Sequence, residues 1–388
     1  MKPSNTPSSD RLTTLLYVTA TVGAALLAVG AFVAPDRIWS NLLVASYYLV
    51  TLSLGALLFI ALAYVSGAGW SVAFRRVPEA MASLLPVTGL AVVAVVAVRL
   101  KDYAWHPRGP HSGDNFWFKD WWLEPRWILT RAIVCVLLWI VFAKLIVGIS
   151  RYAGPHSGTR SLTSNVRLSA VFLVVVGLSF SCVSIDWLMA LEPMWFSTMW
   201  AVYQFSGMVM ATLAAIVVLC LMLRQQGVLK GIFTDDHLHD LGKLLLGFSC
   251  FWMYIWFSQY MLIWYSNIPE ETSWFITRTH GPWLPVFVAN IIVNWAVPFL
   301  VLLPRPAKRN PGVMMKVAVL ILVARWIDLY LVVFPKTVGS TPVFGLWEIA
   351  AITCGIGLFG LLFFRQFDSA SSVPSSDPYL NESLHHHC

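Results

Sequence analysis

Long runs of apolar residues constrain this sequence more than any other feature. A membrane-spanning helix needs about 20 mostly apolar residues. Ten such runs occur, at about residues 12–34, 42–65, 84–100, 128–149, 168–190, 198–223, 243–265, 282–303, 314–334 and 345–365. The pattern predicts an all-α polytopic membrane protein, in which residues 1–365 form a single transmembrane domain of about ten helices and residues 366–388 form an extended cytoplasmic tail.

Charged residues are scarce, and most lie beside the runs. Only 12% of the 388 residues are charged and 58% are hydrophobic, whereas about 25% of residues are charged in soluble domains. This excludes an ordinary soluble enzyme and a disordered chain. The net charge of +7 comes from Lys and Arg that orient the spans, so nucleic acid is not an expected partner. More of these residues fall at the chain ends and in the even-numbered loops, which predicts that both termini are cytoplasmic.

Residues that bind redox metals are missing from the runs. All nine histidines lie in predicted loops or in the tail, whereas a membrane cytochrome b holds haem between helices through histidine. The six cysteines form no CxxC pair, which argues against zinc, an iron–sulfur cluster or covalent haem c in this chain. No P-loop occurs, which disfavours an ATP-driven pump. The sequence predicts that the chain itself binds no metal or cofactor.

A small set of polar side chains inside the runs is the main candidate for function. A charge at membrane depth costs at least about 2.5–3.5 kcal/mol unless it is paired or hydrated. The candidate proton-path residues are Asp186, Tyr260, Arg325, Asp328, Gln259, Asn290, Asn294 and Glu348. With cytoplasmic termini, most of them fall in the outer half of the membrane. We therefore expect an outward-facing polar cavity that ends near Arg325 and Asp328, with few titratable groups in the inner half. Such a cavity suits a proton half-channel or a headgroup pocket.

These polar residues also have plainer explanations. Arg325 and Asp328 are three residues apart, so they can form an ion pair within one helix. Asn, Gln, Ser and Tyr often hold membrane helices together through hydrogen bonds. The loop 99–127 is rich in Trp, which fits either a segment in the headgroup region or a docking surface for an external partner.

Several motifs resemble the NrfD/PsrC-like family of integral membrane subunits. One motif is SIDWLMALEPMWFS at residues 184–197. A second begins with DLGKLL at 240–245 and continues through FSQY at 257–260 and IWYSNIPEE at 263–271. A third combines GAGWS at 67–71 with RRVPE at 75–79. Together they look most like the ActF-type subunits of bacterial alternative complex III.

The resemblance implies a subunit of a quinol:electron-acceptor oxidoreductase in the bacterial cytoplasmic membrane. It implies two four-helix bundles, made of spans 2–5 and 6–9, flanked by two peripheral helices. The implied partners are a sister membrane subunit, an iron–sulfur subunit, c-type cytochrome subunits and membrane lipid. Haem c and iron–sulfur clusters would belong to those partner subunits. The sister subunit is the better candidate for quinol oxidation, and whether quinone binds this chain stays open.

Two other functions fit the same pattern of polar residues. A secondary transporter for a small polar solute would use the outer cavity at a repeat interface. A purely structural membrane anchor would use the polar groups only to pack helices. By contrast, as a subunit of the oxidoreductase the chain would support the complex and conduct protons, without catalysing the redox reaction alone.

Overall fold

The computed structural model of the chain describes residues 7–103, 121–152, 158–192 and 194–387. The structure is 84% helical, and these described ranges contain no strand. Within them, ten segments are long and apolar enough to cross a membrane, at Arg11–Val33, Pro35–Val65, Arg76–Val98, Pro125–Tyr152, Arg160–Leu191, Trp200–Gln225, Asp235–Ser266, Gly281–Leu302, Pro311–Thr337 and Leu346–Asp368. Each overlaps one predicted run, which confirms the all-α polytopic membrane fold.

Most spans are single helices, but the third and the eighth are interrupted. The helices are α1 (Pro7–Val33), α2 (Pro35–Val65), α3 (Arg76–Ala82), α4 (Leu85–Val98), α6 (Pro125–Tyr152), α7 (Gly158–Trp187), α8 (Trp200–Gln225), α9 (Asp235–Ser266), α11 (Leu284–Ile291), α12 (Val297–Leu302), α14 (Pro311–Thr337) and α15 (Leu346–Asp368). Short helices α10 (Pro269–Thr279), α13 (Arg305–Arg309) and α16 (Leu380–Leu384) lie at the ends of the bundle.

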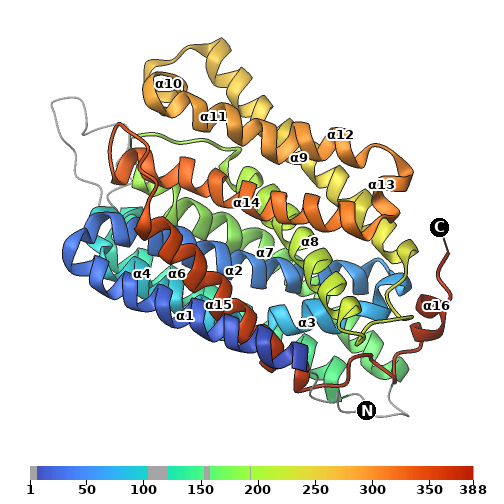
Figure 1. Cartoon of the computed structure of the whole chain (residues 1–388). Helices are drawn as coiled ribbons and strands as arrows, with labels where there is room; N and C mark the ends of the chain where they lie inside the picture. Colours follow the sequence, from blue (N-terminus) through green and yellow to red (C-terminus); the bar gives the residue numbers. More distant parts are fainter. Residues whose placement is uncertain (1–6, 104–120, 153–157, 193, 388) are drawn as a thin grey trace.

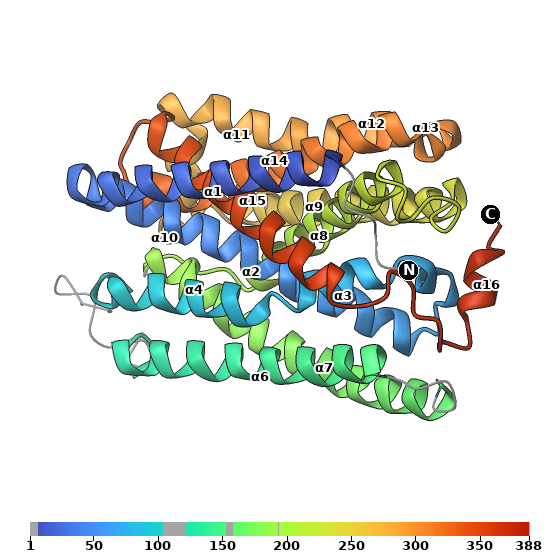
Figure 2. The ribbon, with the colours of Figure 1, turned by 60° about the horizontal axis from the view of Figure 1, so that its bottom comes forward.

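The spans form two four-helix bundles and one peripheral pair (Figures 1 and 2). The first bundle contains α2, α3 with α4, α6 and α7; the second contains α8, α9, α11 with α12, and α14. Helices α1 and α15 pack against each other beside the bundles. A Cβ atom on Gly357 would lie 2.5 Å from the backbone nitrogen of Ala20. Glycine therefore allows the close approach of these two helices, as is common in membranes.

Helix α8 lies at the centre of the assembly. In its most apolar stretch 83% of the residues are buried, the highest share of any span in the described residues. It packs against α9 and α14 within its own bundle and against α2 and α7 of the first bundle. Polar side chains on α8 are therefore shielded from lipid and placed between the bundles.

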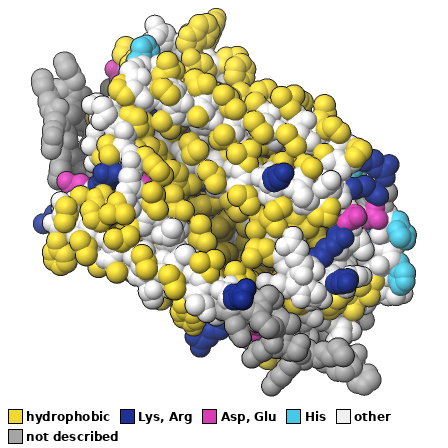
Figure 3. All heavy atoms as spheres, in the orientation of Figure 1, with side chains coloured by type: hydrophobic (Ala, Val, Ile, Leu, Met, Phe, Trp, Pro, Cys, Tyr) yellow, Lys and Arg dark blue, Asp and Glu magenta, His cyan; other side chains and the backbone are white. Residues whose placement is uncertain are grey.

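The surface separates into an apolar middle and charged ends. Figure 3 shows hydrophobic side chains over the middle of one face, with charged side chains mainly toward its two ends. This is the distribution that a bilayer around the helices requires. Helix α1 begins and α16 lies at the same end of the molecule (Figures 1 and 2). We call that end the inner end and the opposite end the outer end.

The tail folds back against the inner end, whereas the sequence analysis expects it to be extended. Helix α16 lies beside the 3-10 helix η1 (Gly69–Phe74). The hydroxyl of Ser383 donates to a backbone carbonyl at η1 and accepts from an N–H of η1. Nε2 of His386 lies 2.7 Å from Oδ2 of Asp240 in α9. Specific polar contacts thus tie the tail to both bundles, and these long-range contacts are not visible in the tail's Ser- and Pro-rich composition.

Helix α9 begins well before its apolar run does. It starts at Asp235, after the N-cap Thr234, and His237 completes a capping box with that residue. His237 and His239 therefore lie in the first turns of a membrane-crossing helix, so the prediction that no histidine lies in a span is wrong here. The polar first turns precede the apolar run, which is why hydropathy alone places the start too late.

Candidate functional site: a buried polar cluster around Asp328

The site centres on an ion pair inside α14. NH1 of Arg325 lies 2.5 Å from Oδ2 of Asp328, and both side chains are fully buried. The three-residue spacing indicates this pair, and the structure forms it. The free energy needed to remove two charges from water exceeds their electrostatic attraction unless further hydrogen bonds satisfy both groups. The other partners of the pair are therefore central to what the site can do.

Asp328 accepts hydrogen bonds from three helices. Besides Arg325 in α14, the hydroxyl of Tyr203 in α8 and Nδ2 of Asn290 in α11 both donate to Oδ1 of Asp328, the second over 3.0 Å. Tyr203 and Asn290 are themselves buried. The carboxylate thus joins three helices of the second bundle, and the phenol of Tyr203 gives it a neighbour that both donates and accepts a hydrogen bond.

The guanidinium of Arg325 lies against α8. NH2 donates to Oε1 of Gln204 over 2.8 Å. Gly207, three residues along α8, leaves the space that the guanidinium fills. A Cβ atom on Gly207 would lie 2.7 Å from Cζ and 3.1 Å from Nε of Arg325. Both distances are shorter than ordinary contact, so the glycine is part of the site.

A π-helical turn, η5 (Ile292–Ala296), joins α11 to α12 beside the cluster. Nδ2 of Asn294 in this turn donates to Oδ1 of Asn290 over 2.7 Å and to the carbonyl of Ala324 over 3.2 Å. The carbonyl of Asn294 accepts from the hydroxyl of Ser249 over 2.7 Å. The four-residue spacing predicts that the two asparagines share a helix face, and this contact is confirmed. Single π turns inside α-helices are frequent at functional sites.

Several buried polar atoms around the ion pair have no hydrogen-bond partner among the described residues. They include the Tyr47 hydroxyl of α2, Nε2 of Gln204 and Nε of Arg325. Buried polar groups are nearly always hydrogen-bonded, and internal water serves those that the protein leaves unpaired. Tyr47 belongs to the first bundle and the other two residues to the second. These atoms therefore lie on both sides of the contact between the two bundles.

Asp186 lies in the first bundle, in a separate polar site near the outer end. Nε of Arg131 donates to Oδ2 of Asp186 over 2.6 Å, and Nε1 of Trp122 donates to Oδ1 over 2.9 Å. The guanidinium also lies over the Trp122 ring, 4.2 Å from its centroid. Arg131 was not predicted from the sequence, because an arginine near the end of an apolar run is expected to reach the lipid headgroups. The sequence did contain one indication of this contact, because Asp186 is an acid within another span and needs a positively charged partner.

The contacts of Glu348 join two helices. Its carboxylate accepts from the N–H of Gly345 over 2.8 Å at the start of α15, from Nε of Arg37 over 2.8 Å and from Nδ2 of Asn41 over 2.9 Å. It therefore caps α15 and ties that helix to α2. These contacts explain why the acid is buried, and its role as a proton-path group stays a prediction.

Tyr260 and Gln259 lie further along α9, away from the ion pair. The ring of Tyr260 stacks on Trp256, with 5.7 Å between centroids, and Trp256 stacks in turn on Trp252 at 6.3 Å. Trp252 packs against Tyr203 at 6.1 Å. A row of aromatic rings thus connects Tyr260 to Tyr203, and Gln259 is buried next to Tyr260 in sequence. Both stay predicted proton-path residues.

A further acid, Glu79 of α3, is fully buried at the inner end of the first bundle. NH1 of Arg76 lies 2.6 Å from its carboxylate, the hydroxyl of Ser150 donates to it over 2.5 Å, and Nε of Arg151 lies 3.9 Å away. Glu79 is a buried acid that was not predicted from the sequence. Helix α3 precedes the apolar run but is buried in the bundle, so residues predicted to be a loop become part of the interior.

The tail contributes to this inner polar region through Asp377. Its carboxylate pairs with Arg75, whose guanidinium also donates to the Tyr64 hydroxyl over 3.1 Å and lies over the Tyr64 ring. Burial alone would lower the pKa of Arg75, but Tyr64, Asp377 and Glu79 more than offset it and raise the pKa above its usual value. Arg75 therefore remains charged and holds the tail.

At the outer end, Arg278 of α10 compensates for a proline in α14. Pro335 has no N–H to donate to the carbonyl of Leu331, four residues earlier. Nε of Arg278 donates to that carbonyl over 2.8 Å, and NH2 donates to the carbonyl of Val332 over 3.0 Å and to Glu192 over 2.8 Å. Burial lowers the pKa of Arg278, while Glu192 acts in the opposite direction. The arginine therefore fixes the outer end of α14, which carries Asp328.

An apolar hollow of about 210 Å³ lies between α2, α8 and α9. Ser66 and Thr212 provide hydroxyl groups, and the lining that the structure describes includes no titratable side chain. A quinol-oxidising site needs a group that accepts the quinol proton. The lining of this hollow does not fit such a site.

The described residues contain no group of three or more His, Cys, Asp or Glu placed to hold a metal ion.

Neither the protein-family models nor the curated proteins match this chain. The predicted docking surface in the loop 99–127 lies mainly at residues 104–120, outside the described residues.

Proposed function

We propose that the chain is an ActF-type membrane subunit of a quinol:electron-acceptor oxidoreductase of the alternative complex III kind. It would support the complex and conduct protons through a polar half-channel on the outer side, without binding a redox metal itself. Its proposed partners are a sister membrane subunit, an iron–sulfur subunit and c-type cytochrome subunits. The proposed location is the bacterial cytoplasmic membrane, with both termini cytoplasmic.

The observation that carries the proposal is the hydrogen bonding of Asp328. This fully buried carboxylate is held by Arg325, Tyr203 and Asn290 from three helices. An ionisable residue within a membrane-spanning helix is a candidate member of a proton relay. Tyr203 and Asn290 connect this carboxylate by hydrogen bonds to two further helices.

In this proposal Asp328 alternates between its charged and its protonated form, and its neighbours would accommodate the change. Protonation of the carboxylate would weaken its pairing with Arg325, whose guanidinium would keep its hydrogen bond to Gln204. The Tyr47 hydroxyl and Gln204 Nε2 have no hydrogen-bond partner among the residues that the structure describes, and water would meet the cluster at these atoms. The π turn at Asn294 is an irregular stretch of helix that can adjust as the charge changes.

The test is coupled turnover of the intact complex in liposomes. Asp328→Asn is expected to lower the number of protons moved per electron while subunit content and quinol oxidation persist. Glu79→Gln is the matched control, because it also neutralises a buried acid paired with arginine but lies in the first bundle, outside the cluster. It is expected to leave the ratio unchanged. Tyr203→Phe keeps the ion pair and removes one hydroxyl, so it is expected to reduce the ratio without losing assembly.

The two alternative functions give different results in the same preparation. If Asp328→Asn leaves proton coupling intact in an assembled complex, the chain is a structural anchor. If the protein purifies without haem-bearing partners and moves a polar solute across liposomes, it is a secondary transporter. Either result would overturn the proposal.

A further inference from the structure

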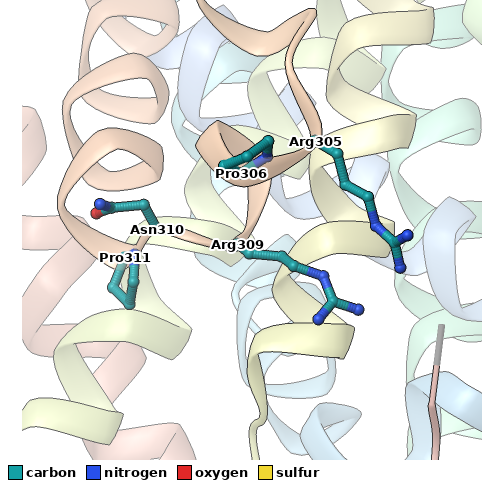
Figure 4. Close-up of a pocket in the computed structure, with 5 residues that line it drawn as sticks. All are labelled: Arg305, Pro306, Arg309, Asn310 and Pro311. Carbon is teal, nitrogen blue, oxygen red and sulfur yellow. The ribbon is translucent and has the colours of Figure 1, made fainter.

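We propose that the depression between α13 and α14 at the inner end binds the phosphate headgroup of an anionic phospholipid. The depression has a volume of about 490 Å³ and is lined by Arg305, Pro306, Arg309, Asn310 and Pro311. Figure 4 shows Arg305 and Arg309 extending from α13 in the same direction. The proposal does not depend on the proposed function of the chain.

The two arginines give the depression a positive charge that an anion would complement. They are four residues apart on one helix, so they face the same side, and like charges at this spacing repel each other. None of the five lining residues is acidic. Asp236 of α9 pairs with Arg309 from outside the lining and fixes the position of its guanidinium. A guanidinium carries five N–H donors, so it can serve this carboxylate and a phosphate together.

Lys308, the third basic residue of α13, does not line the depression. Nζ of Lys308 donates to the carbonyls of Leu302, Leu303 and Pro304, over 2.6, 3.0 and 3.3 Å. These carbonyls lie at and just after the end of α12, where helices leave such groups unpaired. Lys308 thus completes the end of α12, and Arg305 and Arg309 are the basic residues that line the depression.

The two helices that α13 connects, α12 and α14, carry exposed apolar side chains. Leu300 and Leu303 are 67% and 57% exposed at the end of α12, and Val319 and Val323 are 45% and 51% exposed on α14. In a bilayer these side chains would meet acyl chains. The arginines lie just beyond the apolar span, at the depth where basic side chains meet lipid phosphates. A ligand with both a phosphate and acyl chains therefore fits better than a soluble anion.

The experiment measures lipid binding to the full-length protein in mild detergent by native mass spectrometry and thermal unfolding. The probes are phosphatidylglycerol, phosphatidylcholine and inorganic phosphate. Phosphatidylglycerol is expected to bind about tenfold more tightly than phosphatidylcholine and to raise the unfolding temperature, since each basic residue adds to the attraction of an anionic lipid. Inorganic phosphate is expected to have little effect. Equal protection by inorganic phosphate would overturn the lipid assignment.

Paired variants separate this site from a general effect of positive charge. The variant Arg305→Gln with Arg309→Gln is expected to lose the preference for phosphatidylglycerol. Arg305→Gln alone, which leaves the contact between Arg309 and Asp236 in place, is expected to lose part of it. The control Lys230→Gln with Arg365→Gln removes two charges elsewhere on the chain and is expected to keep the preference. If the control loses it equally, or the Arg305 and Arg309 variant keeps it, the proposal is wrong.

Discussion

Gly207 allows a direct test of the geometry around the buried ion pair. In Gly207→Ala the new Cβ would lie 2.7 Å from Cζ and 3.1 Å from Nε of Arg325. The guanidinium is the end of a flexible side chain, but it is fully buried and held by Asp328 at 2.5 Å and Gln204 at 2.8 Å. It cannot move away from α8 without lengthening at least one of these bonds.

The expected cost follows from three effects. Overpacking a close contact costs about 1–3 kcal/mol. Loss of one hydrogen bond to a charged group costs about 1.5–3 kcal/mol. Alanine is better than glycine in a helix by about 1 kcal/mol, which offsets part of this loss. We therefore expect Gly207→Ala to lower the free energy of unfolding by about 1.5–5 kcal/mol.

Gly247→Ala in α9 provides the matched control. A Cβ atom there meets nothing within 4 Å, so this variant is expected to be neutral or to gain up to about 1 kcal/mol from helix propensity. Unfolding of both variants in mixed detergent micelles can be followed by Trp fluorescence. Equal stability of Gly207→Ala and Gly247→Ala would refute the tight packing of Arg325 against α8.

Three further substitutions test the other buried charges. Arg131→Met leaves the carboxylate of Asp186 uncompensated and is expected to lower stability by about 3–5 kcal/mol, whereas Asp186→Asn combined with it should recover part of the loss in the same unfolding assay. Arg278→Met removes the donors that serve the proline-bearing end of α14 and is expected to cost about 1–3 kcal/mol; an unchanged unfolding midpoint would contradict that role. Asp377→Asn removes the carboxylate that holds the tail, so limited proteolysis should cut the tail faster than in the parent protein, and equal cleavage rates would argue against the contact.

The architecture could be predicted from the sequence because it depends on local properties. Apolar runs of span length recur ten times, and each run becomes a span in the structure. The pairing of Arg325 with Asp328 and of Asn290 with Asn294 also follows from helix spacing alone. These contacts need only the geometry of one helix.

The missed features depend on contacts between distant segments. Arg131 meets Asp186 from another helix, and Gln204 meets Arg325 from a separate span. The residue pattern within one helix does not predict which residue of another helix it will contact. Glu79 was missed because its helix precedes the apolar run, so hydropathy assigns it to a loop although the bundle buries it.

Vibrational difference spectroscopy tests most directly whether Asp328 changes its protonation during turnover. Infrared difference spectra of the proposed complex, taken between its quinol-reduced and oxidised states, report the C=O stretch of a protonated carboxylic acid. The account predicts a difference band in this region that is absent in Asp328→Asn and shifted in Tyr203→Phe, because Tyr203 donates to the same carboxylate. An identical band in the parent complex and in Asp328→Asn would contradict the account.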